Sequence, residues 1–151
     1  MVQQKITALC LLDLSAAFDT IDHSILIHRL SSWFGLNGTV LSWLHSYISS
    51  REFVVNIKDN LSDAFPLHQG VPQGSVLGPL LFILYTTPLS SLISDSSVNH
   101  HLYADDTQLF ISFSALDFTP NISHLKATID NVSTWMSANL LSLNQSKTEF
   151  L

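Results

Sequence analysis

The stretch VNHHLYADDTQLFISF, residues 98–113, decides the fold class that the sequence predicts. Its two apolar arms, 98–102 and 107–113, flank Tyr103-Ala104-Asp105-Asp106 and predict a short β-hairpin with two acids at its tip. Since Asp favours turns, a solvated hairpin tip is the simplest interpretation of this acid pair taken alone. The flanking residues are apolar and predict burial, however, and two buried carboxylates need a positive charge or a proton that offsets their repulsion.

A third acid, Asp13, ends the apolar segment 6–13, which predicts a buried strand. Two carboxylates about 4 Å apart repel each other by about 4 kcal/mol at an effective dielectric constant of about 20. No Lys or Arg lies within ten positions of Asp105 or Asp106, so no salt bridge is available locally. A divalent cation, or protonation of one acid, is the remaining option. Oxygen ligands without cysteine suit Mg²⁺ or Mn²⁺.

The composition excludes several classes of protein. The chain has 151 residues, a length typical of one domain, and 46% of them are hydrophobic. Only 12% are charged and the net charge is -6, whereas a self-sufficient nucleic-acid binder is normally basic. The single cysteine, Cys10, leaves no internal disulfide and no thiolate cluster for zinc, and its apolar surroundings predict burial.

The N-terminal apolar stretch is too short for the core of a signal peptide, so we predict no export signal. The Asn-X-Ser/Thr triplets are then incidental rather than glycosylation sites, and they stand at Asn37, Asn60, Asn121, Asn131 and Asn144. Residues 64–94 contain no Asp, Glu, Lys or Arg, and this uncharged segment is long enough for a membrane span. Four prolines interrupt this segment, so we expect a buried core helix and no membrane partner.

Periodicity predicts helices over residues 23–34, 39–48, 76–85 and 121–139. Asp22 is the expected N-cap of the first helix, Gly35 its stop, and Pro88 a break after the third. A second hairpin is predicted from 53–57 and 62–67 around Lys58-Asp59-Asn60, and closing strands from 140–143 and 148–151. The tryptophans are expected in the core, namely Trp33, Trp43 and Trp135.

A glycine-rich loop, QGVPQGS at residues 69–75, precedes the third predicted helix. Such a loop lets the backbone approach a ligand closely, and the helix N-terminus after it favours an anion. Acids for a metal together with a loop for phosphate or sugar suggest phosphoryl transfer.

These segments together resemble reverse transcriptases of non-LTR (LINE-type) retrotransposons. LDLSAAFDTIDH (residues 12–23), the loop 69–75 with Gly78-Pro79, and YADD (residues 103–106) resemble three of that family's motifs in the right order. Group II intron and telomerase-type enzymes share the hairpin, but the sequence around Phe18 and His23 favours the LINE type. The resemblance implies an α+β palm, a small antiparallel sheet backed by helices, as a partial domain over 1–151 with fingers and thumb largely absent.

The resemblance also implies an RNA-directed DNA polymerase that adds dNTPs to a DNA primer on an RNA template. Asp13 and Asp105 would ligate two Mg²⁺ ions about 4 Å apart, with Mn²⁺ as a possible substitute and Asp106 supporting the site. One ion would activate the primer 3′-hydroxyl, and the other would hold the triphosphate and the leaving pyrophosphate.

Four further residues receive roles from the resemblance. Phe18 matches an aromatic that lies under the nucleotide sugar and excludes a 2′-hydroxyl, with a core phenylalanine as the alternative. Gln73 and Gly74 match a loop that contacts the incoming nucleotide and the template. Lys147, within LNQSKT at residues 143–148, matches a lysine that protonates pyrophosphate, with a surface lysine as the equal alternative.

The resemblance explains both the excess of apolar residues and the shortage of basic ones. Missing fingers and thumb segments would supply the cations that the chain lacks and would cover part of its apolar surface. A nuclear location is expected from the resemblance alone. The alternative function is an inactive remnant of a retrotransposon that acts, if at all, as a metal-binding or protein-interaction domain.

Overall fold

The computed structural model describes residues 5–151, which divide into two compact units. One unit combines the chain up to Ala17 with Thr86–Leu151, and the other is Phe18–Tyr85. The chain therefore leaves the first unit just after the Asp13 strand and returns to it within the long apolar helix.

The first unit is built on a four-stranded antiparallel sheet of order β10-β1-β8-β7. Its strands are β1 (Lys5–Leu12), β7 (Asn99–Tyr103), β8 (Asp106–Ser114) and β10 (Glu149–Phe150). Side chains alternate between the two faces of a strand, and one face buries Ala8, Cys10, Leu12, Thr107 and Leu109. The predicted strand, the acidic hairpin and the buried cysteine are confirmed, and burial raises the pKa of the Cys10 thiol.

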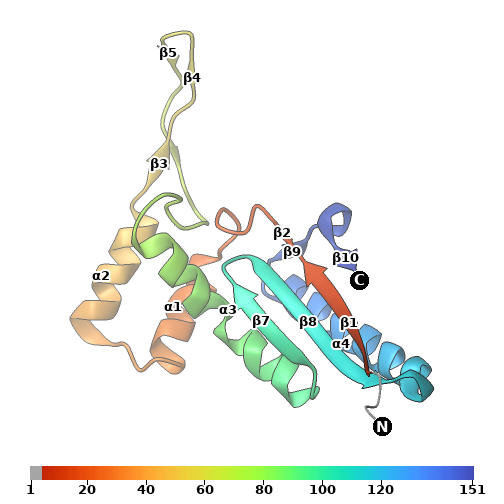
Figure 1. Cartoon of the computed structure of the whole chain (residues 1–151). Helices are drawn as coiled ribbons and strands as arrows, with labels where there is room; N and C mark the ends of the chain where they lie inside the picture. Colours follow the sequence, from red (N-terminus) through yellow and green to blue (C-terminus); the bar gives the residue numbers. More distant parts are fainter. Residues whose placement is uncertain (1–4) are drawn as a thin grey trace. The chain divides into compact units, whose positions relative to one another are not determined.

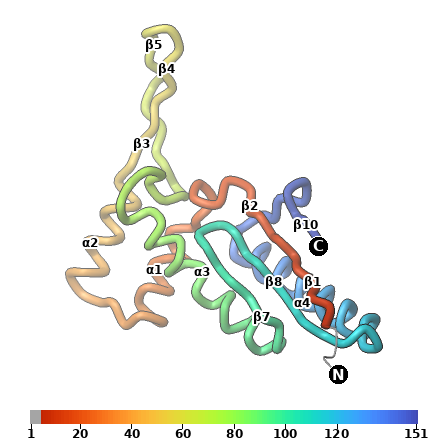
Figure 2. The backbone as a smooth tube through the Cα atoms, viewed as in Figure 1, coloured from red at the N-terminus to blue at the C-terminus, as the bar shows by residue number. Residues whose placement is uncertain are grey.

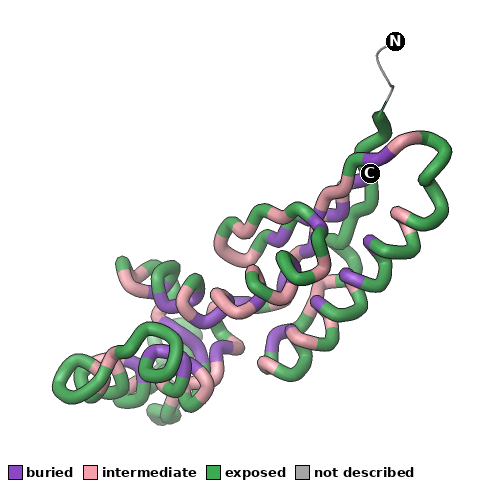
Figure 3. Tube along the Cα trace, turned by 90° about the horizontal axis from the view of Figure 1, so that it is seen from below, coloured by how far each residue is buried: buried purple, intermediate pink, exposed green. Residues whose placement is uncertain are grey.

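Helix α4 (Phe118–Ala138) packs along this sheet, and it contacts β8 (Figure 1). Its buried residues recur at helical spacing, as the sequence predicts, and they are Leu125, Thr128, Val132 and Met136. The short elements that follow and flank it are β2 (Leu14–Ser15) paired with β9 (Ser142–Leu143), and the 3₁₀ turns η1 (Ala115–Asp117) and η2 (Gln145–Lys147). Along the whole trace, buried, intermediate and exposed positions are interspersed (Figure 3), whereas all residues of η1 and η2 are exposed.

In the second unit, helices α1 (His23–Ser32) and α2 (Gly38–Ser49) pack against each other. Asp22 caps α1 as predicted, since its carboxylate accepts a 2.9 Å hydrogen bond from the Ile25 amide. Hydrogen bonds from the Ser24 hydroxyl and the Ile25 amide hold the pKa of Asp22 below its usual range.

The predicted burial on these two helices is only partly right. Helix α1 ends two residues before Phe34, and Trp33 beyond it is 52% exposed. Trp43 of α2 is 54% exposed and stacks on Tyr47 with 5.5 Å between ring centroids. The expectation of core tryptophans is therefore wrong for Trp33 and Trp43, because helical spacing indicates a shared face but not what covers it.

The second hairpin extends from the end of α2 as a narrow arm (Figure 2). It pairs β3 (Glu52–Phe53) with β6 (Phe65–Pro66), and β4 (Asn56–Ile57) with β5 (Asn60–Leu61). Its turn residues Lys58 and Asp59 have positive φ of 48° and 67°, the conformation that favours tight hairpins. Every residue from 52 to 66 is exposed, so this arm adds no core to the unit.

Helix α3 (Leu77–Asp95) continues through Pro88, so the predicted break is wrong. A proline inside a helix lacks an N–H and disturbs the turn before it. There the Arg29 guanidinium donates to the Tyr85 carbonyl and lies 4.7 Å from the centroid of the Tyr85 ring. Burial lowers the pKa of Arg29 and raises that of Tyr85. This contact ties the turn before Pro88 to α1, although the carbonyl that Pro88 itself cannot bond is that of Leu84.

Among the described helices, α3 alone is long and apolar enough to cross a membrane, judged by length and composition. Its buried side chains recur on one face, at Leu81, Phe82, Tyr85, Leu89 and Ile93. That one-sided pattern is typical of a core helix.

Candidate active site

Two of the three predicted carboxylates come together at one end of the sheet. Strands β1 and β8 pair up to Leu12 opposite Thr107, and Asp13 and Asp106 are the residues next to this last pair. Directly opposed residues on neighbouring strands have Cβ atoms about 5 Å apart and point to the same face. Leu12 and Thr107 are buried, so both acids lie on the opposite, outer face.

This outer face forms a cleft of about 400 Å³. Asp13 and Asp106 line it together with Ser146 and Lys147, which come from η2. Residues from three segments that are far apart in the sequence therefore line one cleft: the end of β1, the start of β8, and the η2 turn with β10.

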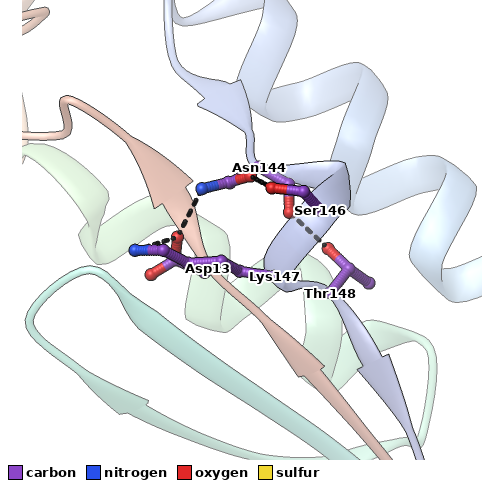
Figure 4. A network of polar contacts seen from close by, with 5 residues as sticks. All are labelled: Asp13, Asn144, Ser146, Lys147 and Thr148. Atoms are coloured by element: carbon purple, nitrogen blue, oxygen red, sulfur yellow. Dashed lines mark hydrogen bonds and ion pairs between the residues drawn. The ribbon is translucent and has the colours of Figure 1, made fainter.

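The Asp13 carboxylate has two side-chain partners, and both reach the same oxygen (Figure 4). Lys147 Nζ lies 3.4 Å from Asp13 Oδ2, and Asn144 Nδ2 donates to Oδ2 over 3.1 Å. The Asp13 side chain is 18% exposed, whereas that of Lys147 is 68% exposed. An exposed ion pair of this kind adds little stability, about 0–1 kcal/mol. It does supply a cation at the Asp13 carboxylate, from a residue that lies far from Asp13 in the sequence.

Asn144 is the residue that the sequence reasoning missed. Its backbone amide also donates to the Asp13 carbonyl over 2.8 Å, so one residue contacts both the main chain and the side chain of Asp13. The available signal was its place in LNQSKT, beside Lys147, although the same asparagine also begins an Asn-X-Ser triplet.

Asp105 lies in the tight turn between β7 and β8, where Tyr103 pairs with Asp106. Ala104, the other turn residue, has a positive φ of 51°. Asp105 is half-buried and is not among the residues that line the cleft, unlike Asp106. The structure therefore places Asp13 closer in register to Asp106 than to the turn residue Asp105.

Residues 5–151 contain no group of three or more His, Cys, Asp or Glu side chains placed to hold a metal ion. The donor set nevertheless suits Mg²⁺, because that ion is usually bound by one or two carboxylates with water and substrate phosphates completing its shell. Asp13 and Asp106 provide such a pair on one face.

The remaining predicted site residues belong to the second unit. Phe18 is half-buried and packs on Phe82, with 5.1 Å between ring centroids. The glycine-rich loop binds the segment after Phe18 through backbone hydrogen bonds, from Gly70 to Ile21 (2.7 Å) and from Val71 to Phe18 (2.8 Å). Further along the same loop, Gln73 and Gly74 are exposed.

Substitution of Gly70 by Ala should destabilise the second unit more than the same change at Gly74. Both glycines have positive φ, 90° and 81°, so both variants carry the backbone strain, about 1–2 kcal/mol. A Cβ on Gly70 would lie 3.0 Å from the Asp19 carbonyl oxygen, whereas one on Gly74 meets nothing within 4 Å. We expect Gly70→Ala to cost about 1–3 kcal/mol more, measured by chemical unfolding. Equal losses would show that the loop does not pack on Asp19 in solution.

Comparison with known proteins is consistent with this geometry. The sequence matches the family described as "Reverse transcriptase (RNA-dependent DNA polymerase)" over residues 1–151. It is 29% identical over 142 residues to a probable RNA-directed DNA polymerase from transposon BS of Drosophila melanogaster, covering 91% of this chain. It is 32% identical over 102 residues, 64% of this chain, to the RNA-directed DNA polymerase from mobile element jockey of the same species. The chain spans only 15% and 11% of the lengths of these two relatives.

Solved structures show the same fold. Apo telomerase from Candida tropicalis, truncated from its C-terminal domain, superposes with a TM-score of 0.74 at 18% identity, over 96% of this chain and 30% of that one. The telomerase of that species in complex with a TWJ fragment of telomeric RNA also gives a TM-score of 0.74, at 17% identity, over 96% of this chain and 26% of that one. The mixed helix and sheet arrangement with a small antiparallel sheet is thus the predicted palm-like α+β fold.

Proposed function

Because the chain belongs to the reverse transcriptase family of RNA-directed DNA polymerases, we propose that it forms the carboxylate-bearing part of an active polymerase. That polymerase adds deoxynucleotides to the 3′-hydroxyl of a DNA primer on an RNA template. The observation that carries the proposal is the outer-face cleft, in which Asp13, Asp106 and Lys147 meet.

The family uses divalent metal ions. In this chain Asp13 would hold Mg²⁺, or Mn²⁺ in its place, together with Asp106, which lines the same cleft. The resemblance assigns the second ligand to Asp105, which precedes Asp106 in the hairpin turn and would support the site from there. Bound there, the ions supply a positive charge that stabilises the attacking and leaving oxygens of an in-line displacement.

The chain's own groups have distinct tasks in this proposal. Asp13 presents a carboxylate that is mostly shielded from water, with its Oδ2 oriented by Asn144. Lys147 holds a proton at Nζ beside the same cleft, where it can protonate the leaving pyrophosphate once nucleotide has displaced it from Asp13. Gln73 and Gly74 contact the incoming nucleotide and the template through a loop that is exposed for such contacts.

The nucleic-acid partners need cations that this chain does not carry, since its net charge is -6. Fingers and thumb segments outside these residues would provide them, and a nuclear location would give access to chromosomal DNA. Mg²⁺-dependent primer extension on an RNA template, by the polymerase that contains this chain, tests the proposal. Extension that is no greater with Mg²⁺ than in its absence would contradict it.

Replacing Phe18 with Val should increase incorporation of ribonucleotides relative to deoxynucleotides by about tenfold or more, because a smaller side chain leaves room for the 2′-hydroxyl. The measurement is the ratio of kcat/KM values for the two substrates in primer extension. Phe82→Leu, which changes the ring that Phe18 packs against, is the control for lost packing. If both variants lower kcat/KM without changing the ratio, Phe18 is a core residue and not the sugar gate.

A further inference from the structure

We propose that Asn144 is a positioning residue that orients the Asp13 carboxylate for cation binding. This inference rests on the proposed function, because it assumes that Asp13 is a metal ligand. Asn144 has no role in the resemblance from which the other site residues were assigned, and only its contacts in the folded chain point to it.

The first support is that Asn144 donates two hydrogen bonds to Asp13. Its backbone amide donates to the Asp13 carbonyl (2.8 Å), and its side-chain Nδ2 donates to Asp13 Oδ2 (3.1 Å). The first bond fixes the main chain just beyond the end of β1, and the second fixes the rotation of the carboxylate. Together they leave Oδ1, and the remaining lone pair of Oδ2, for other partners.

The second support is that Asn144 is itself held in place. The Ser146 hydroxyl donates to Asn144 Oδ1 over 2.7 Å, and the Thr148 hydroxyl donates to the Asn144 carbonyl over 3.0 Å (Figure 4). Because Oδ1 accepts from Ser146, the NH₂ end of the amide is the end that faces Asp13. Such outer contacts, which fix the orientation of a ligand, are a recurrent part of metal sites.

The third support is the contrast with Lys147, which reaches the same oxygen. An ammonium neutralises the carboxylate and competes with any other cation for it, whereas the neutral amide of Asn144 leaves the carboxylate charge in place. The two neighbours of Asp13 should therefore have opposite effects on its affinity for a metal ion.

The test is a Mn²⁺ titration of the 151-residue chain, with free Mn²⁺ measured by electron paramagnetic resonance. We expect Asn144→Ala to weaken Mn²⁺ binding about tenfold, at an unchanged melting temperature, since loss of an outer contact typically lowers metal affinity by at least that factor. Lys147→Met should strengthen binding, because a competing cation is removed. Ser146→Ala, which only frees the amide to rotate, should weaken binding less than Asn144→Ala, and it serves as the readout if Asn144→Ala does not fold.

Asp13→Ala separates the two ways in which this experiment can fail. If Asp13→Ala binds Mn²⁺ as tightly as the unaltered chain, the metal-ligand assignment in the proposed function is wrong. If Asp13→Ala loses binding while Asn144→Ala and Ser146→Ala retain it unchanged, the metal assignment stands and the positioning role is overturned. A loss in Asn144→Ala together with a gain in Lys147→Met supports the inference.

Discussion

Replacing Asp13 with Asn should lower RNA-templated primer extension at least about 10³-fold in the polymerase that contains this chain. The expected size follows from the proposed role of Asp13 as a metal ligand, because metal ions contribute several kcal/mol of transition-state stabilisation and each 1.4 kcal/mol is about tenfold in rate. Asn keeps the size of the side chain and can still accept the Asn144 hydrogen bond, so the variant removes mainly the charge. The measurement is single-turnover extension at saturating nucleotide.

Glu149→Gln is the matched control, since Glu149 lines the same cleft and loses the same charge. It stands on β10 opposite Leu11, and no role in metal binding is assigned to it. We expect this variant to extend primers within about tenfold of the unaltered polymerase, which is less than the effect of a lost metal ligand. Losses of equal size at Asp13 and Glu149 would mean that the overall charge of the cleft matters and that Asp13 has no special position.

Local patterns were enough to predict most of the elements. The short apolar runs 6–13 and 107–113 predict two strands, and the spacing of Leu125, Val132 and Met136 predicts the core side of α4. These features depend only on residues close in sequence. Pro88 misled because α3 buries apolar side chains on both sides of it, at Tyr85 and Leu89, and this packing is not visible in the local pattern.

The same limit explains what was missed in the candidate site. The acids stood out because carboxylates are rare in apolar strands, and the pairing of β1 with β8 brings Asp13 and Asp106 to one cleft. Asn144 was missed, and Lys147 was found only through the family resemblance. Both lie more than 130 positions from Asp13, and only the pairing of β10 with β1 and of β9 with β2 brings them to it. Contacts between residues so far apart in the sequence cannot be predicted from the residues that neighbour the acids.

Part of the apolar excess is visible on the surface of the second unit. Large apolar side chains that are about half exposed or more include Trp33, Val40, Trp43, Phe53, Ile57, Leu61 and Phe65. These residues lie at the end of α1, on α2 and along the hairpin arm. Their exposure agrees with the expectation that further polymerase segments cover part of the apolar excess.

Truncating Phe82 to Ala should cost about 3–5 kcal/mol of unfolding free energy, the usual range for a buried phenylalanine. Phe82 is 0% exposed on α3, and its ring packs on that of Phe18. At about 2–4 °C per kcal/mol for a chain of this size, the melting temperature should fall by about 10 °C. Thermal unfolding followed by circular dichroism measures the change.

Ile83, the next residue on α3, provides the control because it is 52% exposed. Its replacement by Ala should change the free energy of unfolding by about 0.5 kcal/mol or less, as for most surface positions. A large difference between the two neighbours shows that α3 buries one face in a protein core, although its length and composition alone would suit a membrane span. Equal losses at Phe82 and Ile83 would contradict a one-sided core helix. Because Phe82 also packs on Phe18, the same comparison tests whether Phe18 rests on a buried side chain, as its proposed role beside the nucleotide sugar requires.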